Sequence, residues 1–141
     1  MRLLALGCLV SLSCLNCEMA SAHDPLTEFQ WKHRLILHDL NAAEARAFKQ
    51  AVHQNEDALD ERDLRLIALS AEVESKLSLK LEVAAIAQLQ KKFRNQEPSP
   101  KLYLVGKDGG LKMTRLTIEL APIFNRIDSM PMRQAEIQSR E

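Results

Sequence analysis

The sequence predicts one α/β domain whose elements follow the order β-α-β-α-β-β-α. Apolar runs at 34–37, 64–69 and 102–105 are typical of strands that are buried on both faces of a sheet. Apolar residues at helical spacing fill the segments between these runs. Asp108-Gly109, flanked by extended segments, is a strong signal for a tight hairpin. Together these observations predict a four-stranded mixed sheet with helices on both of its faces.

The segment 34–69 predicts a β-α-β unit. The first run, Arg34-Leu35-Ile36-Leu37, is followed by Asn41-Ala42-Ala43-Glu44, which has the spacing of a capping box. We therefore expect a helix from there to about Leu59. The connection to the second run at 64–69 is long enough for a parallel crossover through that helix.

The second half of the domain predicts a helix, a hairpin and a final helix. Small polar residues at 70–78 predict a loop, and apolar residues at steps of four predict a helix over 79–94. A return strand at 111–116 alternates apolar and polar residues, and its Asp-Gly turn is expected to need positive φ at both central residues. From Thr117 onward the pattern predicts a helix, and from about residue 131 a polar helical tail that frays.

The first 22 residues have the pattern of a signal peptide. Arg2 gives a positive start, residues 3–15 are apolar but too short to span a bilayer, and Ala20-Ser21-Ala22 fits the small-x-small rule for cleavage. We therefore expect residues 1–22 to be removed, which leaves a mature domain of residues 23–141. The expected location is the periplasm or the medium outside the cell.

A lipid anchor is the alternative for this first segment. Cys14 follows Ser11-Leu12-Ser13, and a lipoprotein would retain that cysteine. The leucine that usually stands three positions before such a cysteine is absent, so cleavage after Ala22 is preferred. No later segment is apolar enough to cross a membrane.

The cysteines and the net charge limit the possible functions. Cys8, Cys14 and Cys17 are the three cysteines of the chain, so residues 23–141 have no thiol for a disulfide or for redox chemistry. The formal net charge of zero gives no reason to expect nucleic acid or an acidic membrane as a partner. We expect a protein or peptide partner and no cofactor.

Four stretches resemble, in order and spacing, a small bacterial domain of unknown function that is placed among thioredoxin-like, peroxiredoxin-related domains. This bacterial family is also similar to a domain of some animal extracellular-matrix proteins. The resemblance runs from about Leu26 to Glu136 and implies a thioredoxin-like fold without an assigned activity. The four stretches are Trp31-Lys32-His33-Arg34-Leu35-Ile36-Leu37, Glu61-Arg62-Asp63-Leu64, Leu104-Val105-Gly106-Lys107-Asp108-Gly109-Gly110-Leu111-Lys112 and Ile127-Asp128-Ser129-Met130-Pro131-Met132-Arg133.

The junction after the first strand departs from that family. An aromatic-Ala-Pro-like step and a longer polar loop are usual there, and redox-active thioredoxin-like proteins place a nucleophilic cysteine at this junction. Here the strand continues into His38-Asp39-Leu40-Asn41. These residues are candidates for a binding site that uses helix-end amides. The simpler interpretation is that Asp39 and Asn41 cap the helix and that His38 ends the strand.

Pro100 and Trp31 are further residues of interest. Pro100 stands just before the third strand, where thioredoxin-like folds often carry a cis-proline beside the active site, and it would present a backbone edge to a peptide. The alternative is an ordinary trans proline. Trp31 is the only tryptophan and is expected to anchor the entrance of the first strand in the core.

A second group of candidates lies in the hairpin and the C-terminal motif. Lys107, Asp108 and Lys112 mark either a charged recognition hairpin or simple turn chemistry with solvated lysines. Met130 and Met132 form either an adaptable docking patch or a buried hinge that closes the core. Arg133 completes the Ile-Asp-Ser-Met-Pro-Met-Arg motif.

Three functional hypotheses follow, and none assigns a catalytic residue or a metal site. The first is a non-catalytic thioredoxin-like module that binds a partner. The second is a redox-related protein that acts through a retained Cys14 or Cys17. The third is copper binding through an N-terminal His23, whose amine and imidazole could chelate the ion together. The sequence shows no Ser-His-Asp order, zinc pattern or phosphate-binding glycine loop.

Overall fold

The computed structural model describes residues 23–141, whose apolar runs form the centre of one five-stranded sheet. The predicted signal peptide and its three cysteines lie outside the described residues. The sheet order is β3-β2-β1-β4-β5. The strands are β1 (Arg34–His38), β2 (Leu64–Ala68), β3 (Ser78–Leu79), β4 (Leu102–Val105) and β5 (Leu111–Arg115).

Strand β1 is the central strand and defines two ends of the domain. It pairs in parallel with β2 and antiparallel with β4, and all five of its residues are buried. His38 therefore faces Leu102 at one end, which we call the carboxyl end. Leu35 faces Val105 near the other end, which we call the amino end. Loops that follow β1 and precede β4 meet at the carboxyl end.

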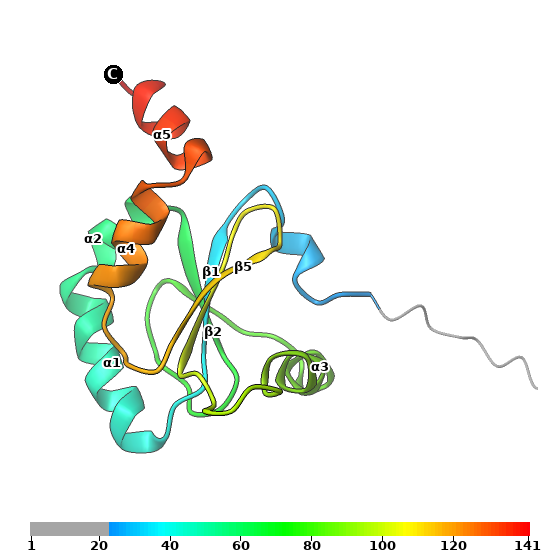
Figure 1. Cartoon of the computed structure of the whole chain (residues 1–141). Coiled ribbons are helices and arrows are strands. Elements are labelled where there is room, and N and C mark those ends of the chain that lie inside the picture. Colours follow the sequence, from blue (N-terminus) through cyan, green and yellow to red (C-terminus); the bar gives the residue numbers. More distant parts are fainter. Residues whose placement is uncertain (1–22) are drawn as a thin grey trace, which may run out of the picture.

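Helices cover both faces of the sheet, as predicted. Figure 1 shows α1, α2 and α4 on one face and α3 on the other, with α5 beyond the amino end of β1. No helix in the described part of the chain has the length and apolar character of a membrane-spanning segment. The helices are η1 (Thr27–Phe29), α1 (Ala42–Gln54), α2 (Glu56–Glu61), α3 (Val83–Phe93), α4 (Ala121–Asp128) and α5 (Pro131–Gln138).

Two apolar clusters hold the layers together. Successive residues of a strand point to opposite faces, so Ile36 packs with Phe48 of α1 while Leu35 and Leu37 pack with Leu89 of α3. Each such fully buried side chain contributes about 1.5–3 kcal/mol relative to an exposed one. These clusters stabilise a domain in which no disulfide links residues 23–141.

The helix predicted to run to Leu59 is two helices. α1 ends at Gln54, and Asn55 has φ −124° and ψ 18°, outside the helical region. Its side-chain amide donates to the carbonyl of Ala51 at 2.8 Å, and its backbone N–H donates to Val52. Asparagine competes for local backbone groups in this way and therefore interrupts helices.

The predicted boundary between a loop at 70–78 and a helix that begins at residue 79 is wrong. Ser78 and Leu79 pair in parallel with Leu66 and Ile67 of β2, which forms β3 and delays the start of α3 to Val83. The sheet therefore has five strands where four were predicted. A two-residue strand has no periodicity for a sequence pattern to detect.

The hairpin between β4 and β5 is longer than the predicted two-residue turn. Gly109 has φ +81°, whereas Asp108 does not have a positive φ. The N–H of Gly109 donates to Gly106 at 3.0 Å, and the register shifts beside Val105. A left-handed glycine after the turn produces a bulge of this kind. At Gly109 a Cβ would lie 2.4 Å from the amide nitrogen of Gln30.

The C-terminal segment differs from its prediction in two ways. The final helix begins at Ala121, with Pro122 in its first turn, rather than at Thr117. The tail from Pro131 is helical, as predicted, but it carries a buried Arg133 that donates to the carbonyl and carboxylate of Glu61 at 3.1 and 2.7 Å. Arg133 and the half-buried Glu136 face the domain, while most other side chains of the tail are exposed.

Trp31 is not part of the core, contrary to the prediction. Its side chain is 67% exposed, and its backbone has φ +65°, a left-handed conformation that is uncommon for a bulky residue. A hydrogen bond of 2.6 Å from its N–H to the carbonyl of Lys107 holds this segment against the hairpin.

Candidate functional site

The structure separates the predicted interaction residues into two groups at opposite ends of β1. The register of β1 and β4 requires this separation, because Pro100 precedes β4 and the hairpin follows it. At the carboxyl end lie His38, Asp39, Asn41 and Pro100, and at the amino end lie Lys107, Asp108, Met130, Met132 and Arg133.

His38 is a buried, neutral imidazole at the carboxyl end. It is the last residue of β1, is 1% exposed, and its ring tilts against Phe48 with centroids 5.5 Å apart. Burial lowers the pKa of His38 to about 4, which the nearby Asp39 carboxylate only partly opposes. Its Nδ1 is buried and has no hydrogen-bond partner. An unpaired buried nitrogen lowers the stability of the fold, and His33 Nδ1, Arg115 Nε and Arg133 Nε share this feature.

Asp39 forms an ion pair rather than a helix cap. Both of its oxygens accept hydrogen bonds from Arg94, at 2.5 and 2.7 Å. These bonds are the main reason that the pKa of Asp39 lies below its usual value. Arg94 also donates to the carbonyl of Leu69 at 3.2 Å, which ties the end of α3 to the loop after β2.

Asn41 is the cap of α1, as the spacing predicted. Its side-chain oxygen accepts from the N–H of Glu44 at 2.9 Å, and Glu44 accepts from the N–H of Asn41 at 3.1 Å. The capping box is therefore confirmed. Glu44 also pairs with Lys101, so the start of α1 is joined to the start of β4.

The cis peptide bond in this region precedes Pro98, not Pro100. The alternative that Pro100 is a cis-proline is therefore wrong. Pro100 is buried, and the next residue, Lys101, accepts from the N–H of Asp39 at 2.9 Å and donates to Arg115 at 2.7 Å. The backbone around Pro100 is thus already paired.

A pocket of about 400 Å³ opens beside His38 along the β3 edge of the sheet. It borders both core clusters, since Leu66 belongs to one cluster while Leu79 and Ile86 pack against the other. Val83 at its rim is 87% exposed. The lining residues are His38, Leu66, Ala68, Ser70, Glu72, Val73, Glu74, Ser75, Ser78, Leu79, Lys80, Leu81, Val83 and Ile86.

Sequence reasoning found His38 but missed the rest of this pocket. Ser70 is the clearest example, because its hydroxyl accepts from the N–H of Leu40 and donates to the carbonyl of Leu40, both at 2.8 Å. It fixes the loop after β1 against the loop after β2. Ser78 and Leu79 line the pocket because they form β3, a strand that the sequence pattern did not predict.

The amino end holds a network of buried ion pairs around Glu136. Arg34 is buried and donates to both oxygens of Glu136 at 3.2 Å. Lys107 donates to Glu136 at 2.7 Å and to Asp63 at 2.8 Å. Burial opposes the ionisation of Glu136, but hydrogen bonds from Lys107 and Arg34 outweigh it and hold the pKa of this carboxyl below its usual value.

A second set of pairs in the network joins α2, α4 and α5. Arg62 donates to both oxygens of Asp128, at 3.0 and 2.7 Å, and its guanidinium lies 4.7 Å from the centre of the Phe124 ring. These hydrogen bonds lower the pKa of Asp128, and Arg133 adds a smaller effect of the same sign. Arg133 reaches Glu61 from the other side. The C-terminal motif is thus clamped to the body of the domain.

The two methionines of that motif differ. Met130 is half-buried and packs against the larger core cluster, as the hinge interpretation predicted. Met132 is 42% exposed and does not close the core. Both border a second pocket at the amino end, together with Lys107 and Asp108.

Metal ligands are not grouped in the part of the chain that the structure describes. No three His, Cys, Asp or Glu side chains of residues 23–141 lie together as a metal site would require. His23 is exposed at the start of this part, beside Pro25 and Glu82.

Comparisons with known proteins agree on the fold. A sequence family described as a domain of unknown function, DUF4174, matches residues 25–136. The reduced 2-Cys peroxiredoxin of Plasmodium vivax is 15% identical with a TM-score of 0.55, covering 79% of this chain and 84% of its own. Thioredoxin peroxidase I of Plasmodium yoelii is 15% identical with a TM-score of 0.53, covering 78% and 79%.

No curated protein matches the chain. The likeness to the two Plasmodium proteins confirms the expected thioredoxin-like α/β fold, and at this identity it shows the fold alone.

Proposed function

The chain belongs to the DUF4174 family of domains of unknown function, and we propose that it is an exported, non-catalytic module that binds an extended segment of a partner protein. The observation that carries this proposal is the pocket beside His38, which adjoins the edge strand β3. An uncharged imidazole, a lining in which apolar side chains outnumber the charged Glu72, Glu74 and Lys80, and an adjoining edge strand together suit a peptide better than a charged small molecule.

The absence of a thiol in residues 23–141 supports binding rather than redox catalysis. At the junction after β1 the polar side chains hold the fold together, because Asp39 pairs with Arg94 and Asn41 caps α1. A hydroxyl at this end, that of Ser70, is occupied by the backbone of Leu40. These groups stabilise the junction after β1 through hydrogen bonds within the domain.

The walls of the pocket favour an apolar side chain of the partner. Ala68, Leu79, Leu81 and Ile86 contribute apolar surface, and His38 is uncharged near pH 7 because of its low pKa. A partner side chain in this pocket would remove apolar surface from water at about 25 cal/mol per Å². Because the buried His38 is neutral, it places no charge beside this apolar surface.

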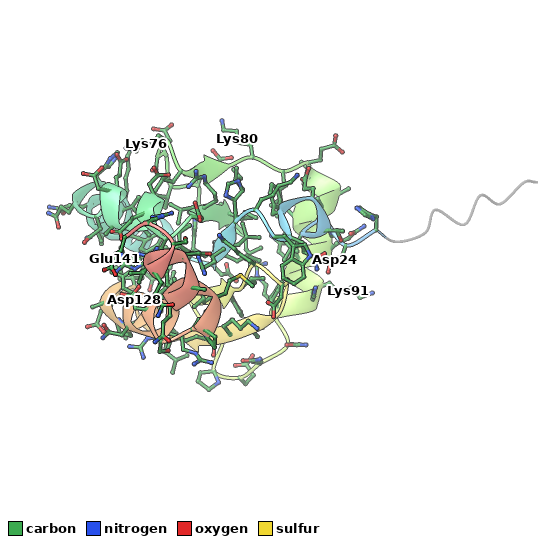
Figure 2. All side chains as sticks on the ribbon, turned by 90° about the horizontal axis from the view of Figure 1, so that it is seen from above. Asp24, Lys76, Lys80, Lys91, Asp128 and Glu141 are labelled. Carbon is green, nitrogen blue, oxygen red and sulfur yellow. The ribbon has the colours of Figure 1, made fainter. Side chains whose placement is uncertain are left out.

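The β3 edge gives the partner a backbone to pair with. β3 lies at the end of the sheet, where it pairs with β2. The N–H of Ser78 on its outer side already donates to the carbonyl of Ser75 at 3.1 Å, so a partner strand would have to displace this turn bond or pair through the carbonyl of Ser78. Ser78 and Leu79 belong both to this strand and to the pocket wall. Figure 2 shows Lys76 and Lys80 along the same edge of the molecule. A peptide added to β3 would therefore place alternate side chains into the pocket.

The test is peptide binding to the full chain, followed by amide chemical shifts in NMR. The probe is the neutral peptide Ac-Val-Thr-Leu-Thr-Val-NH2, which favours an extended conformation. We expect shifts at Ser78 to Leu81 and a loss of at least tenfold in affinity for Ala68→Phe, which fills the pocket. Ala87→Phe, at an exposed position of α3, is the matched control and should bind normally.

Two results would overturn the proposal. The first is equal affinity of the Ala68→Phe and Ala87→Phe variants. The second is a set of shifts confined to β5, the opposite edge of the sheet, because that would place an edge-binding partner away from His38.

A further inference from the structure

The amino end contains a second pocket, of about 350 Å³, whose charged lining is mostly positive. Arg34, Lys107, Lys112 and Arg126 border it, and Asp108 is the one acid among its lining residues. These side chains come from β1, the hairpin, β5 and α4. The pocket is therefore formed where four separate parts of the fold meet.

The four cations differ in how far they are already neutralised. Arg34 and Lys107 both form ion pairs with Glu136, and Lys107 forms a second one with Asp63. Lys112 has one carboxylate partner, Asp108, at 2.6 Å, and this pair is partly exposed.

Arg126 is exposed and, among the four, is the cation that makes no ion pair within residues 23–141. An exposed pair such as Lys112–Asp108 contributes about 0–1 kcal/mol to the free energy of unfolding, so it can rearrange at little cost. Lys112 and Arg126 are thus the cations with capacity for another anion.

The remaining wall of the pocket has Ser129 and Gly106 beside an apolar part. Met130, Pro131 and Met132 line it, and Met132 is largely open to solvent. Methionine side chains adapt to irregular apolar surfaces. These three residues also form the start of α5, which has no side-chain cap, and the partial positive charge of a helix start adds to the field of the cations.

We infer that this pocket binds a small organic anion, whose carboxylate or phosphate contacts Lys112 and Arg126 while its apolar part packs on Met132. Oxyanions form their strongest hydrogen bonds with charged donors of this kind. The pocket size suits a small molecule, and the zero net charge of the chain makes this a local property rather than a general attraction for polyanions. This site is separate from the one proposed beside His38 and does not depend on it.

The test is isothermal titration of the full chain with four probes. Phenyl phosphate and benzoate carry an anion and a ring, inorganic phosphate carries the anion alone, and phenol carries the ring alone. We expect phenyl phosphate or benzoate to bind at least tenfold more tightly than inorganic phosphate and phenol. The tighter of the two aromatic anions identifies the oxyanion that the site prefers.

Three variants locate the binding. Lys112→Gln should weaken the preferred aromatic anion about tenfold, whereas Lys91→Gln, an exposed lysine of α3, should leave its affinity unchanged. Met132→Ala should weaken the aromatic anion but not inorganic phosphate. Thermal unfolding of each variant shows that it is folded.

Two results would overturn the inference. One is equal binding by the Lys112→Gln and Lys91→Gln variants. The other is an affinity for phenyl phosphate and benzoate no greater than that for inorganic phosphate, because then the methionine wall takes no part.

Discussion

The two ends of β1 differ in how far their buried polar side chains form ion pairs. At the amino end, the buried Arg34 and Arg133 form ion pairs that tie several elements to α5, although Arg133 Nε has no hydrogen-bond partner. At the carboxyl end, His38 is equally buried, yet its Nδ1 has no partner and a pocket lies beside it. The ion pairs of the amino end hold α5 to the domain, whereas the uncharged His38 of the carboxyl end forms no ion pair and borders the pocket for which we propose a partner.

The largest expected effect comes from breaking the network at Glu136. Glu136→Ala leaves Arg34 buried without its carboxylate, and the loss of one partner of a buried ion pair costs about 3–5 kcal/mol. Urea unfolding of this variant and of Glu119→Ala, an exposed carboxylate with one long ion pair, measures the difference. A loss below about 1 kcal/mol for Glu136→Ala would show that the network does not hold α5.

The next effect is a pH dependence of stability that arises from His38. Its pKa is about 4 in the folded state and 6.5 in the unfolded chain, so the unfolded state binds more protons between these values. Stability is unaffected above pH 6.5 and falls as the pH is lowered towards 4, by about 2 kcal/mol at pH 5. His38→Leu should remove this loss and raise stability at pH 7 by about 1 kcal/mol, because it eliminates the unpaired nitrogen.

Urea unfolding at pH 7.5 and pH 5 checks this prediction, with the exposed His53→Leu as control. The carboxylates change the stability over a different, lower pH range. The pKa values of Asp39, Asp128 and Glu136 are lowered, so their contribution is present above about pH 4.5 and is lost below it. If the His38→Leu variant lost as much stability at pH 5 as the native chain, His38 would not be the buried neutral group described above.

A smaller effect is expected from the cap of α1. Asn41→Ala removes the acceptor for the N–H of Glu44 and should cost about 1 kcal/mol. Asn41→Asp should retain most of the stability, because aspartate is an equally good cap. Thermal unfolding of the two variants compares them. If both variants lost the same stability, the hydrogen bond from the N–H of Glu44 to the side chain of residue 41 would not be what stabilises α1.

The smallest effect is expected at the Asp39–Arg94 pair. Arg94 is partly exposed, so Asp39→Asn should cost only about 0.5–1 kcal/mol despite the two-bond geometry. The loss should shrink when the salt concentration is raised to about 1 M, where the Debye length is about 3 Å. A salt-independent loss would instead indicate that the hydrogen bonds, not the charges, matter.

The sequence predicted the centre of the fold because that part depends on local patterns. The apolar runs of β1, β2 and β4 and the capping box at Asn41 each follow from neighbours in the chain. β3 could not be predicted, since its two residues become a strand only by pairing with β2. Trp31 was misplaced for a similar reason, because a bond to the distant Lys107 holds it outside the core.

The candidate sites were predictable only in part. His38 was identified by its position after the first strand, but its pocket combines segments that are far apart in the chain. Lys107, Asp108, Met130 and Met132 were selected separately, and the structure brings them to one pocket. Arg133 carried no sign of burial, because a charged residue in a polar tail is normally solvated.

The most direct test of the central claim, binding without a thiol, is a peroxide-consumption and insulin-reduction assay on two full chains. One is the native sequence, and the other carries Cys8→Ser, Cys14→Ser and Cys17→Ser together. We expect that neither chain exceeds the buffer rate and that both bind the peptide probe with the same affinity. Activity in the native chain that is lost in the serine variant would contradict this expectation in favour of a retained thiol, and activity in both would contradict the non-catalytic assignment itself.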